Sequence, residues 1–364
     1  MLRRFILAGA GGAAALGTAS YLTVRGMGSM ETYASEVASM RAPLPAQPAM
    51  LDLIRYATLA PNGHNTQPWT FRLREDGIDI LPDLTRRTPV VDPDDHHLFV
   101  SLGCATENLA LAAAASGRSG RIRFDPAGDG FVSFRFAEGP AESADLFGAI
   151  VQRQSTRAEF DGRPAGVADL QALATAAAVP GVELVLITDR PGMNLVRDLV
   201  VSGTRAQMDD PAFLRELTSW LRFNPREAIA SGDGLFSAAS GRPSTPGWLG
   251  PLLFRAFATA ASEGDAYARQ IRSSAGIAIF LGDREDREHW VRVGRACQRF
   301  ALKATALGLR HAFINQPVEV PALRPALAGV LGLAGRRPDI VMRFGHGPTL
   351  PYAARRPPGN VVLT

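Results

Sequence analysis

Hydrophobic residues at helical spacing predict several helices along the chain. From Met50 apolar residues recur three or four positions apart, and this helix is expected to end before Pro61, because the residue before a proline disfavours the helical region. A longer helix is predicted from Asp92, a candidate N-cap, to about Ser116. Further helices are predicted at 144–152, 167–178, 190–205 and 285–307.

Short apolar runs bounded by turn residues predict strands between these helices. The run at 182–188 is continuous and indicates a buried strand, as does the run at 277–281. The other predicted strands lie at 70–73, near Ile122, at 131–136 and at 339–344. Helices and strands therefore occur in both halves of the chain.

Several segments lack this periodicity and predict connections. Residues 25–47 are expected to be a linker, and 138–143 contains a plausible boundary between an N-terminal half at 48–140 and a C-terminal half at 141–364. Residues 223–250, rich in Gly, Ser and Pro, are expected to form a lid or excursion. The tail at 348–364 is expected to wrap over another part of the molecule.

One helical segment recurs in the second half. Shifting residues 101–117 by 191 positions places them on 292–308 and matches Gly103 with Gly294. The shift also matches Ala105, Ala110, Leu111, Ala113, Ala115 and Gly117 with Ala296, Ala301, Leu302, Ala304, Ala306 and Gly308. Helices rich in small residues can pack closely. The repeat therefore predicts two fused halves that form an intramolecular pseudo-dimer with these helices at its centre.

The first 24 residues have the pattern of a targeting segment. Arg3 and Arg4 are followed by apolar residues and a Gly/Ala-rich stretch without an acid, which resembles a twin-arginine export signal. Cleavage of this signal and retention of it as a membrane anchor both remain open, since about 20 apolar residues can span a bilayer. We expect an exported protein, periplasmic or anchored facing the periplasm, whose partners include the export machinery.

Composition and charge exclude several classes. The 364 residues include 39 Lys and Arg against 35 Asp and Glu, for a net charge of +4. Lys303 is the only lysine, and the arginines are interspersed with acids rather than clustered, so no nucleic-acid partner is expected. Two cysteines cannot support a disulfide scaffold. Cys104 and Cys297 are expected to be buried free thiols.

Three motifs carry a family resemblance. The segment Ala60–Trp69, with the sequence APNGHNTQPW, resembles the APSxxNxQPW signature of the FMN-dependent nitroreductase family, with Asn62 in place of serine. The segment Arg153–Arg157, RQSTR, resembles the RRSxR element of the family, with Gln154 as a departure. The arginines at 355–356 resemble its C-terminal phosphate arm. The fused halves, the leader and the stretches 315–317 and 336–338 resemble the single-chain, Acg-type FMN-binding oxidoreductases.

The resemblance implies a fold and a cofactor. It implies an α+β fold, an α/β/α sandwich, with FMN as cofactor and NAD(P)H as a possible electron donor. In homodimeric members the loop of one subunit and the phosphate element of the other build a site together. Here the two motifs lie in different halves of one chain, so one FMN per chain is expected, in a monomeric pseudo-dimer or a higher oligomer.

The resemblance also implies roles for individual residues. Arginine forks and a serine hydroxyl suit a phosphate dianion, which assigns Arg153, Ser155 and Arg356 to the phosphate, with Arg355 as a second candidate. The neighbouring loop is expected to lie against the flavin ring, with Asn65 bonding its pyrimidine edge. Two alternatives stay open: arginines of the second motif pair with surface acids, or the loop residues serve only the turn. The complete set of expected cofactor-binding residues is Pro61, Asn62, Gly63, Asn65, Arg153, Gln154, Ser155, Arg355 and Arg356.

Other groups of polar residues give weaker evidence of a function. His64 is either a substrate contact or a surface histidine, and no proton-transfer side chain is expected, because a reduced flavin donates hydride itself. No metal site is expected. The group Asp92, Asp94, Asp95, His96 and His97 is more typical of helix capping.

Two functions remain open on this basis. The first is a two-electron FMN oxidoreductase that passes hydride from NAD(P)H or another donor to a nitroaromatic, a quinone or a similar flat small molecule. The second is an FMN-binding or sequestering protein whose lidded site has little or no turnover.

Overall fold

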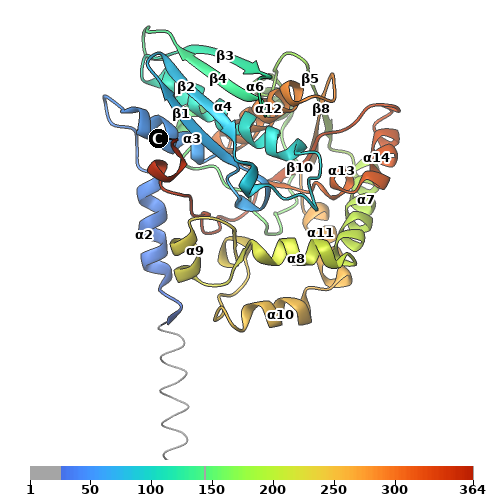
Figure 1. Cartoon of the computed structure of the whole chain (residues 1–364). Coiled ribbons are helices and arrows are strands. Elements are labelled where there is room, and N and C mark those ends of the chain that lie inside the picture. The colour runs from blue at the N-terminus through green and yellow to red at the C-terminus, as the bar shows by residue number, and fades with distance from the viewer. Residues whose placement is uncertain (1–25, 143–144, 364) are drawn as a thin grey trace, which may run out of the picture.

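The structure is a computed structural model that describes residues 26–142 and 145–363 (Figure 1). The predicted targeting segment, 1–24, lies outside the described residues. Within them, two four-stranded antiparallel sheets share one large hydrophobic core. The helices and sheets agree with the predicted α+β class.

The first sheet belongs to the N-terminal half. Its strands are β1 (Trp69–Arg74), β2 (Gly77–Pro82), β4 (Phe131–Phe136) and β3 (Gly120–Asp125), in the spatial order β1-β2-β4-β3. Helix α4 (His96–Ala115) connects β2 to β3 in sequence and shares a core with the sheet. The start of β2 requires Gly77 because β4 approaches it closely: a Cβ there would lie 2.0 Å from the carbonyl oxygen of Phe134.

The second sheet has the same topology. It contains β5 (Val182–Ile187), β8 (Gly276–Gly282), β10 (Ile340–Gly345) and β9 (Arg310–Phe313), in the order β5-β8-β10-β9. Helix α12 (Arg287–Ala306) connects β8 to β9, as α4 connects β2 to β3. The halves therefore repeat one strand order and one central helix, as expected of two fused halves.

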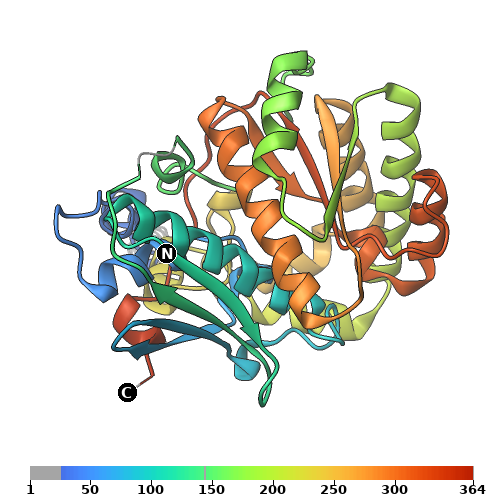
Figure 2. The same cartoon turned by 90° about the horizontal axis from the view of Figure 1, so that it is seen from above.

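The two central helices, α4 and α12, lie side by side between the sheets (Figure 2). A Cβ on Gly103 would lie 2.0 Å from the oxygen of Val291, and a Cβ on Gly294 would lie 2.0 Å from the oxygen of Val100. The offset of 191 found in the sequence repeat converts one contact into the other, because Gly103 corresponds to Gly294 and Val100 corresponds to Val291. The nearby thiols of Cys104 and Cys297 are buried and free, as expected. The small residues of the repeat thus allow the two backbones to touch.

Further helices surround this framework. They are α2 (Met30–Met40), α3 (Met50–Thr58), α5 (Asp145–Ala149), α6 (Val167–Ala176), α7 (Arg190–Met208), α8 (Pro211–Ser219), α9 (Pro225–Ser231), α10 (Gly250–Phe257), α11 (Ala260–Arg272), α13 (Gln316–Glu319) and α14 (Arg324–Val330). Two short strands, β6 (Leu221–Arg222) and β7 (Leu235–Phe236), pair in parallel. The expected lid at 223–250 is part of a longer excursion, since α7 to α11 all lie between β5 and β8.

The expected linker at 25–47 is corrected by the structure. It contains α2, which begins after Ser29, whose hydroxyl accepts a hydrogen bond from the backbone N–H of Thr32. Tyr33 and Val37 of α2 are buried in a small cluster with Phe236 and other residues of the excursion. The tail also returns to the first half, where Leu363 donates its N–H to the oxygen of Phe71. Both ends of the described chain therefore pack against distant segments.

Candidate functional site

Two adjoining cavities contain most of the residues singled out in the sequence. The smaller, of about 70 Å³, is lined by Arg41, Arg153, Arg157 and Arg355, and we call it the arginine cavity. The larger, of about 210 Å³, is the wide cavity. Pro61, Asn62 and Arg157 are among the residues that line both, so the two cavities adjoin. The first half supplies the 61–65 loop and the second half supplies the 153–157 segment.

The loop between α3 and β1 has a strained backbone. His64, Asn65 and Gln67 have φ angles of 46°, 55° and 54°, in the left-handed region that side chains disfavour. Such a conformation costs roughly 1–2 kcal/mol for each residue. Turn chemistry would place glycine at these positions, but Gly63 is not among the positive-φ residues. Strain concentrated beside a cavity is typical of a functional site.

Side-chain amides hold this loop in place. Asn62 Oδ1 accepts from the N–H of Gln67 at 2.8 Å, and Gln67 Nε2 donates to the oxygen of Gly232 at 2.8 Å. Asn65 Nδ2 donates to the oxygen of Gly234 at 3.0 Å. The loop is therefore tied to the long excursion, and the asparagine that replaces the family serine stabilises the turn.

Arg355 supports the same loop from the tail. It is buried, and its guanidinium donates to the oxygens of Thr58 at 2.7 Å and Ala60 at 3.2 Å and to Asn65 Oδ1 at 2.9 Å. Asn65 Nδ2 also donates to Ala354 at 3.2 Å, so both ends of this amide are occupied by protein groups. The structure therefore does not support Asn65 as a partner of the pyrimidine edge. Its contacts position the loop.

The arginine cavity has an unbalanced charge. Four arginines line it, and no aspartate or glutamate of the described residues does so. Burial, reinforced by Arg153, lowers the pKa of Arg41 to about 9, and burial lowers the pKa of Arg153 to about 10. Burial and the neighbouring Arg41 hold the pKa of Arg355 well below its usual value. Buried cations without carboxylate partners create a strong preference for an anion.

The 153–157 segment places its side chains differently. The guanidinium of Arg153 donates to the oxygen of Leu59 at 3.0 Å, so it is not a surface ion pair. Gln154 Nε2 donates to the oxygen of Leu350 at 2.9 Å, and Gln154 Oε1 accepts from the N–H of Leu350 at 2.8 Å. These contacts hold the tail rather than a ligand. Ser155 is half-buried and lines the cavity. Arg153, Ser155 and Arg157, which all line the cavity, are therefore the members of this segment placed for an anion.

Arg356 is placed away from both cavities. Its guanidinium donates to the oxygens of Gln67 at 3.3 Å and Asn360 at 2.9 Å, and lies 3.7 Å from Asp83. Neighbouring side chains of an extended segment point to opposite sides, so only one of two adjacent arginines can enter the cavity. The expected preference for Arg356 over Arg355 is corrected: Arg355 lines the arginine cavity.

Sequence reasoning missed Arg41. It follows α2, within the segment expected to be a linker, and donates to the oxygen of Val151 at 2.7 Å. Its guanidinium lies 3.9 Å from the ring centre of Tyr352, a cation–π contact. The apolar pair Tyr33 and Val37, one helical turn apart, was the available signal for the helix that positions it.

The wide cavity adds several titratable groups. His64, His97, Tyr267 and Glu319 line it, as does Gly63. Burial, followed by the nearby charge of Arg157, lowers the pKa of His64 to about 4. Burial also lowers the pKa of His97 and raises that of Glu319. At neutral pH the histidines of this cavity are therefore uncharged and able to donate one hydrogen bond each.

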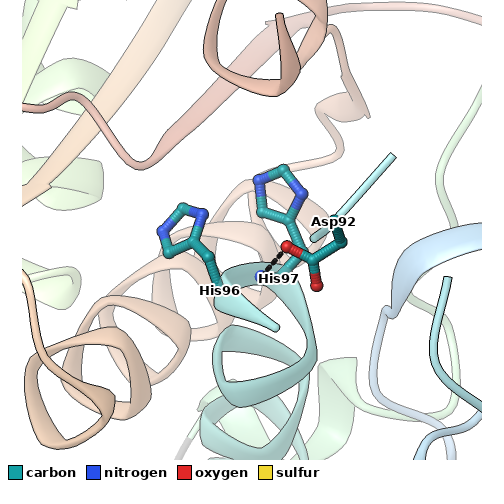
Figure 3. A group of neighbouring side chains, drawn as sticks. All are labelled: Asp92, His96 and His97. Atoms are coloured by element: carbon teal, nitrogen blue, oxygen red, sulfur yellow. Dashed lines mark hydrogen bonds between the residues drawn. The ribbon is translucent and has the colours of Figure 1, made fainter. Parts of the chain in front are cut away.

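The aspartate and histidines at the start of α4 form a compact cluster. Figure 3 shows Asp92, His96 and His97 with candidate ligand atoms within 4.8 Å of one another. Asp92 accepts from the backbone N–H groups of His97 and Leu98, each at 3.0 Å, and His96 Nε2 lies 2.8 Å from Asp339 Oδ1. The two Asp92 contacts are those of a helix cap, at the positive end of a dipole where a further cation is disfavoured.

Acid should destabilise the protein through its buried histidines. Burial and nearby arginines hold the pKa of His311 well below its usual value, as burial does for His64 and His97. A depressed folded pKa means that the unfolded chain binds more protons, so stability is complete above about pH 6.5 and falls as the pH decreases. Each group contributes a slope of up to about 1.4 kcal/mol per pH unit. Urea unfolding at a series of pH values measures it. His64→Gln should reduce the slope by one such group, and an unchanged free energy of unfolding down to about pH 5 would contradict the expectation.

Comparisons with known proteins support the resemblance. No family model matches the chain. It is 28% identical over 336 residues to a Mycobacterium tuberculosis H37Rv protein named "Putative NAD(P)H nitroreductase", covering 89% of this chain and 94% of that protein. It is 24% identical over 317 residues to "Putative NAD(P)H nitroreductase acg" of the same strain, covering 84% and 92%. The resemblance to nitroreductases, Acg included, is thus confirmed across most of the chain.

Solved structures similar to this chain also include nitroreductases. A nitroreductase with bound FMN from Desulfitobacterium hafniense has a TM-score of 0.37 at 18% identity, covering 59% of this chain and 96% of that one. The FMN-dependent nitroreductase NfnB from Mycobacterium smegmatis, in complex with NADPH, has a TM-score of 0.37 at 12% identity, covering 56% and 87%. The sequence relatives, which span more of the chain, are the stronger comparison.

Proposed function

We propose that this chain is an FMN-dependent oxidoreductase of nitroreductase type, with one FMN that occupies the two adjoining cavities. The observation that carries the proposal is the arginine cavity, which is lined by four arginines and by no carboxylate of the described residues. A flavin phosphate is a dianion with oxygens matched to arginine forks. The two fused halves, an internal pseudo-dimer in our interpretation, supply the two motifs of this single site. The curated relatives are named NAD(P)H nitroreductases, which supports NAD(P)H as the donor.

The residues that line the two cavities would have different roles in binding FMN. Arg41, Arg153, Ser155 and Arg157 would hold the phosphate, while Arg355 supports the loop beside it. Pro61, Asn62 and Gly63 form a wall of the wide cavity, where the ring would lie. When bound, FMN supplies a ring that accepts and donates hydride. The protein's part is to orient this ring and to limit the access of water with the long excursion, whose Phe213, Leu217 and Leu235 line the wide cavity.

The location of the protein is a separate proposal. The twin-arginine-like pattern at 1–24 supports export, a route suited to folded, cofactor-loaded proteins. Among the described residues, the only helix long and apolar enough to span a bilayer is α4, which is mostly buried in the core. Membrane anchoring would therefore depend on the leader.

Spectroscopy tests the cofactor and the reaction together. The protein without residues 1–24 should purify with a flavin absorption band near one FMN per chain, and anaerobic NADPH or NADH should bleach it. A band that stays oxidised would favour the alternative function, an FMN-sequestering protein. A protein that takes up no flavin even when FMN is added would contradict the site.

Added FMN should also stabilise the flavin-free protein. A ligand that binds only the folded state raises the free energy of unfolding by about 2.7 kcal/mol at 100 times its Kd. Thermal unfolding with and without FMN measures this, with riboflavin as the matched control that lacks the phosphate. Equal stabilisation by both compounds would contradict the role of the arginine cavity.

A further inference from the structure

Helix α10 exposes an unusual amount of apolar surface. Trp248, just before it, is 69% exposed, and Leu252 and Phe257 within it are 56% and 72% exposed. Large apolar side chains this close together are rarely left in water without a partner. The helix is anchored at its start, where Gly250 packs against the ring of Phe223.

The position of α10 relates it to the start of the described chain. Gly247, before α10, lies against the carboxylate of Glu227 in α9. The neighbouring residue, Arg226, donates its N–H to the oxygen of Met27 at 2.8 Å. Figure 1 shows α10 at the lower edge of the molecule, beneath α8 and α9, and α2 begins on this same side. Helix α9 therefore contacts both the start of the described chain, where the apolar leader joins it, and the segment just before α10.

The charge of this region favours an anionic surface. From Gly234 to Ser262 the sequence contains two arginines and no aspartate or glutamate. Arg242 is neutralised by Glu263 at 2.5 Å, which leaves Arg255 as the arginine of this range without a carboxylate partner among the described residues. Arg255 is exposed on α10, and Arg226 is exposed beside it. A short helix with Trp, Leu, Phe and Arg at its surface is the composition of an element that lies in a membrane interface.

We propose that α10 docks on an anionic lipid bilayer, with Trp248, Leu252 and Phe257 at the level of the headgroups. A short interfacial helix binds weakly alone, and stable attachment needs a second signal. The leader at 1–24 supplies that second signal, because the described chain begins on the face that carries α10. Docking orients the face containing α8, α9 and α10 toward the lipid.

Depth-dependent quenching tests this proposal on the full chain. The protein is reconstituted into vesicles of phosphatidylglycerol and phosphatidylethanolamine that contain brominated acyl chains. Of the other three tryptophans, Trp69 and Trp290 are buried and Trp220 is half-buried. All three remain in Trp248→Phe, so the difference between the wild type and this variant isolates the emission of Trp248. We expect this emission to be quenched several-fold more than that of the other tryptophans. Unquenched Trp248 in vesicle-bound protein would overturn the proposal.

A serine variant distinguishes a lipid surface from a second copy of the chain as the partner of α10. The triple variant Trp248→Ser, Leu252→Ser, Phe257→Ser should bind vesicles several-fold more weakly, without loss of flavin. Val167→Ser, at a residue 73% exposed on α6, is the matched control and should bind as the wild type does. Sedimentation without vesicles tests whether a second copy of the chain covers α10 instead. A wild-type dimer that the triple variant converts to a monomer would show that α10 is covered by another copy, and would also overturn the proposal.

Discussion

Alanine at Gly103 or at Gly294 is expected to destabilise the protein by about 3 kcal/mol, or to prevent folding. Each new Cβ would lie 2.0 Å from a carbonyl oxygen of the opposite helix, Val291 in one case and Val100 in the other. Backbone atoms cannot rotate out of the way as a side chain does, so α4 and α12 would have to separate. Separation would open the core that both sheets share.

Chemical unfolding of the two variants and a control measures this effect. Gly329→Ala in α14 is the control, since nothing lies within 4 Å of a Cβ there, and alanine should be neutral or stabilising by up to about 1 kcal/mol. Because the two contacts are related by the internal repeat, Gly103→Ala and Gly294→Ala should have similar effects. If either variant unfolded like Gly329→Ala, the close approach of the central helices would be wrong.

The central helices were predictable because their pattern is strong and local. Both α4 and α12 are long, and the repeat of small residues identified them as partners before their contact was known. Strand β2 was not predicted, because Asp79 interrupts its apolar run. In the structure Asp79 is fully buried, and its two oxygens pair with Arg74 at 2.7 Å and Arg135 at 2.8 Å. A carboxylate that is neutralised by arginines on the two neighbouring strands cannot be distinguished from a turn residue before the strand pairing is known.

The excursion was only partly predictable. Its Gly, Ser and Pro content indicated irregular structure, but Asp210 and Asn224 each precede a proline and cap a helix, accepting from Ala212 at 2.8 Å and Glu227 at 3.0 Å. An Asp or Asn before Pro is a known helix start, so α8 and α9 had a local signal. Helix α10 had little, since its apolar residues face water rather than a core.

The candidate site was predictable in its motifs but not in its electrostatics. Both motifs do lie at one pair of cavities, while the choice between Arg355 and Arg356 depended on which side of an extended tail faces inward. Arg41 reaches the cavity only through the packing of α2 on the excursion. Tertiary contacts of this kind leave no mark on the local sequence pattern.

Arg157→Met is expected to weaken FMN binding by about 10- to 100-fold while it stabilises the flavin-free protein by about 1 kcal/mol. Arg157 lines both cavities, and its guanidinium has no hydrogen-bond or carboxylate partner in the described part of the chain. Burial lowers the pKa of Arg157, so the uncompensated charge opposes folding when no anion is present. Methionine keeps most of the apolar volume and removes that charge.

Arg355→Met is the comparison variant for Arg157→Met. Arg355 donates to the main chain at Thr58 and Ala60 and to Asn65, so its loss leaves buried acceptors without partners and should destabilise the flavin-free protein by about 3 kcal/mol. Both variants should bind FMN less tightly, but their effects on stability have opposite signs. Flavin titration together with urea unfolding of the flavin-free proteins measures both quantities. If Arg157→Met also destabilised the flavin-free protein, Arg157 would be a structural residue. The arginine cavity would then have one fewer unpaired charge to bind a phosphate.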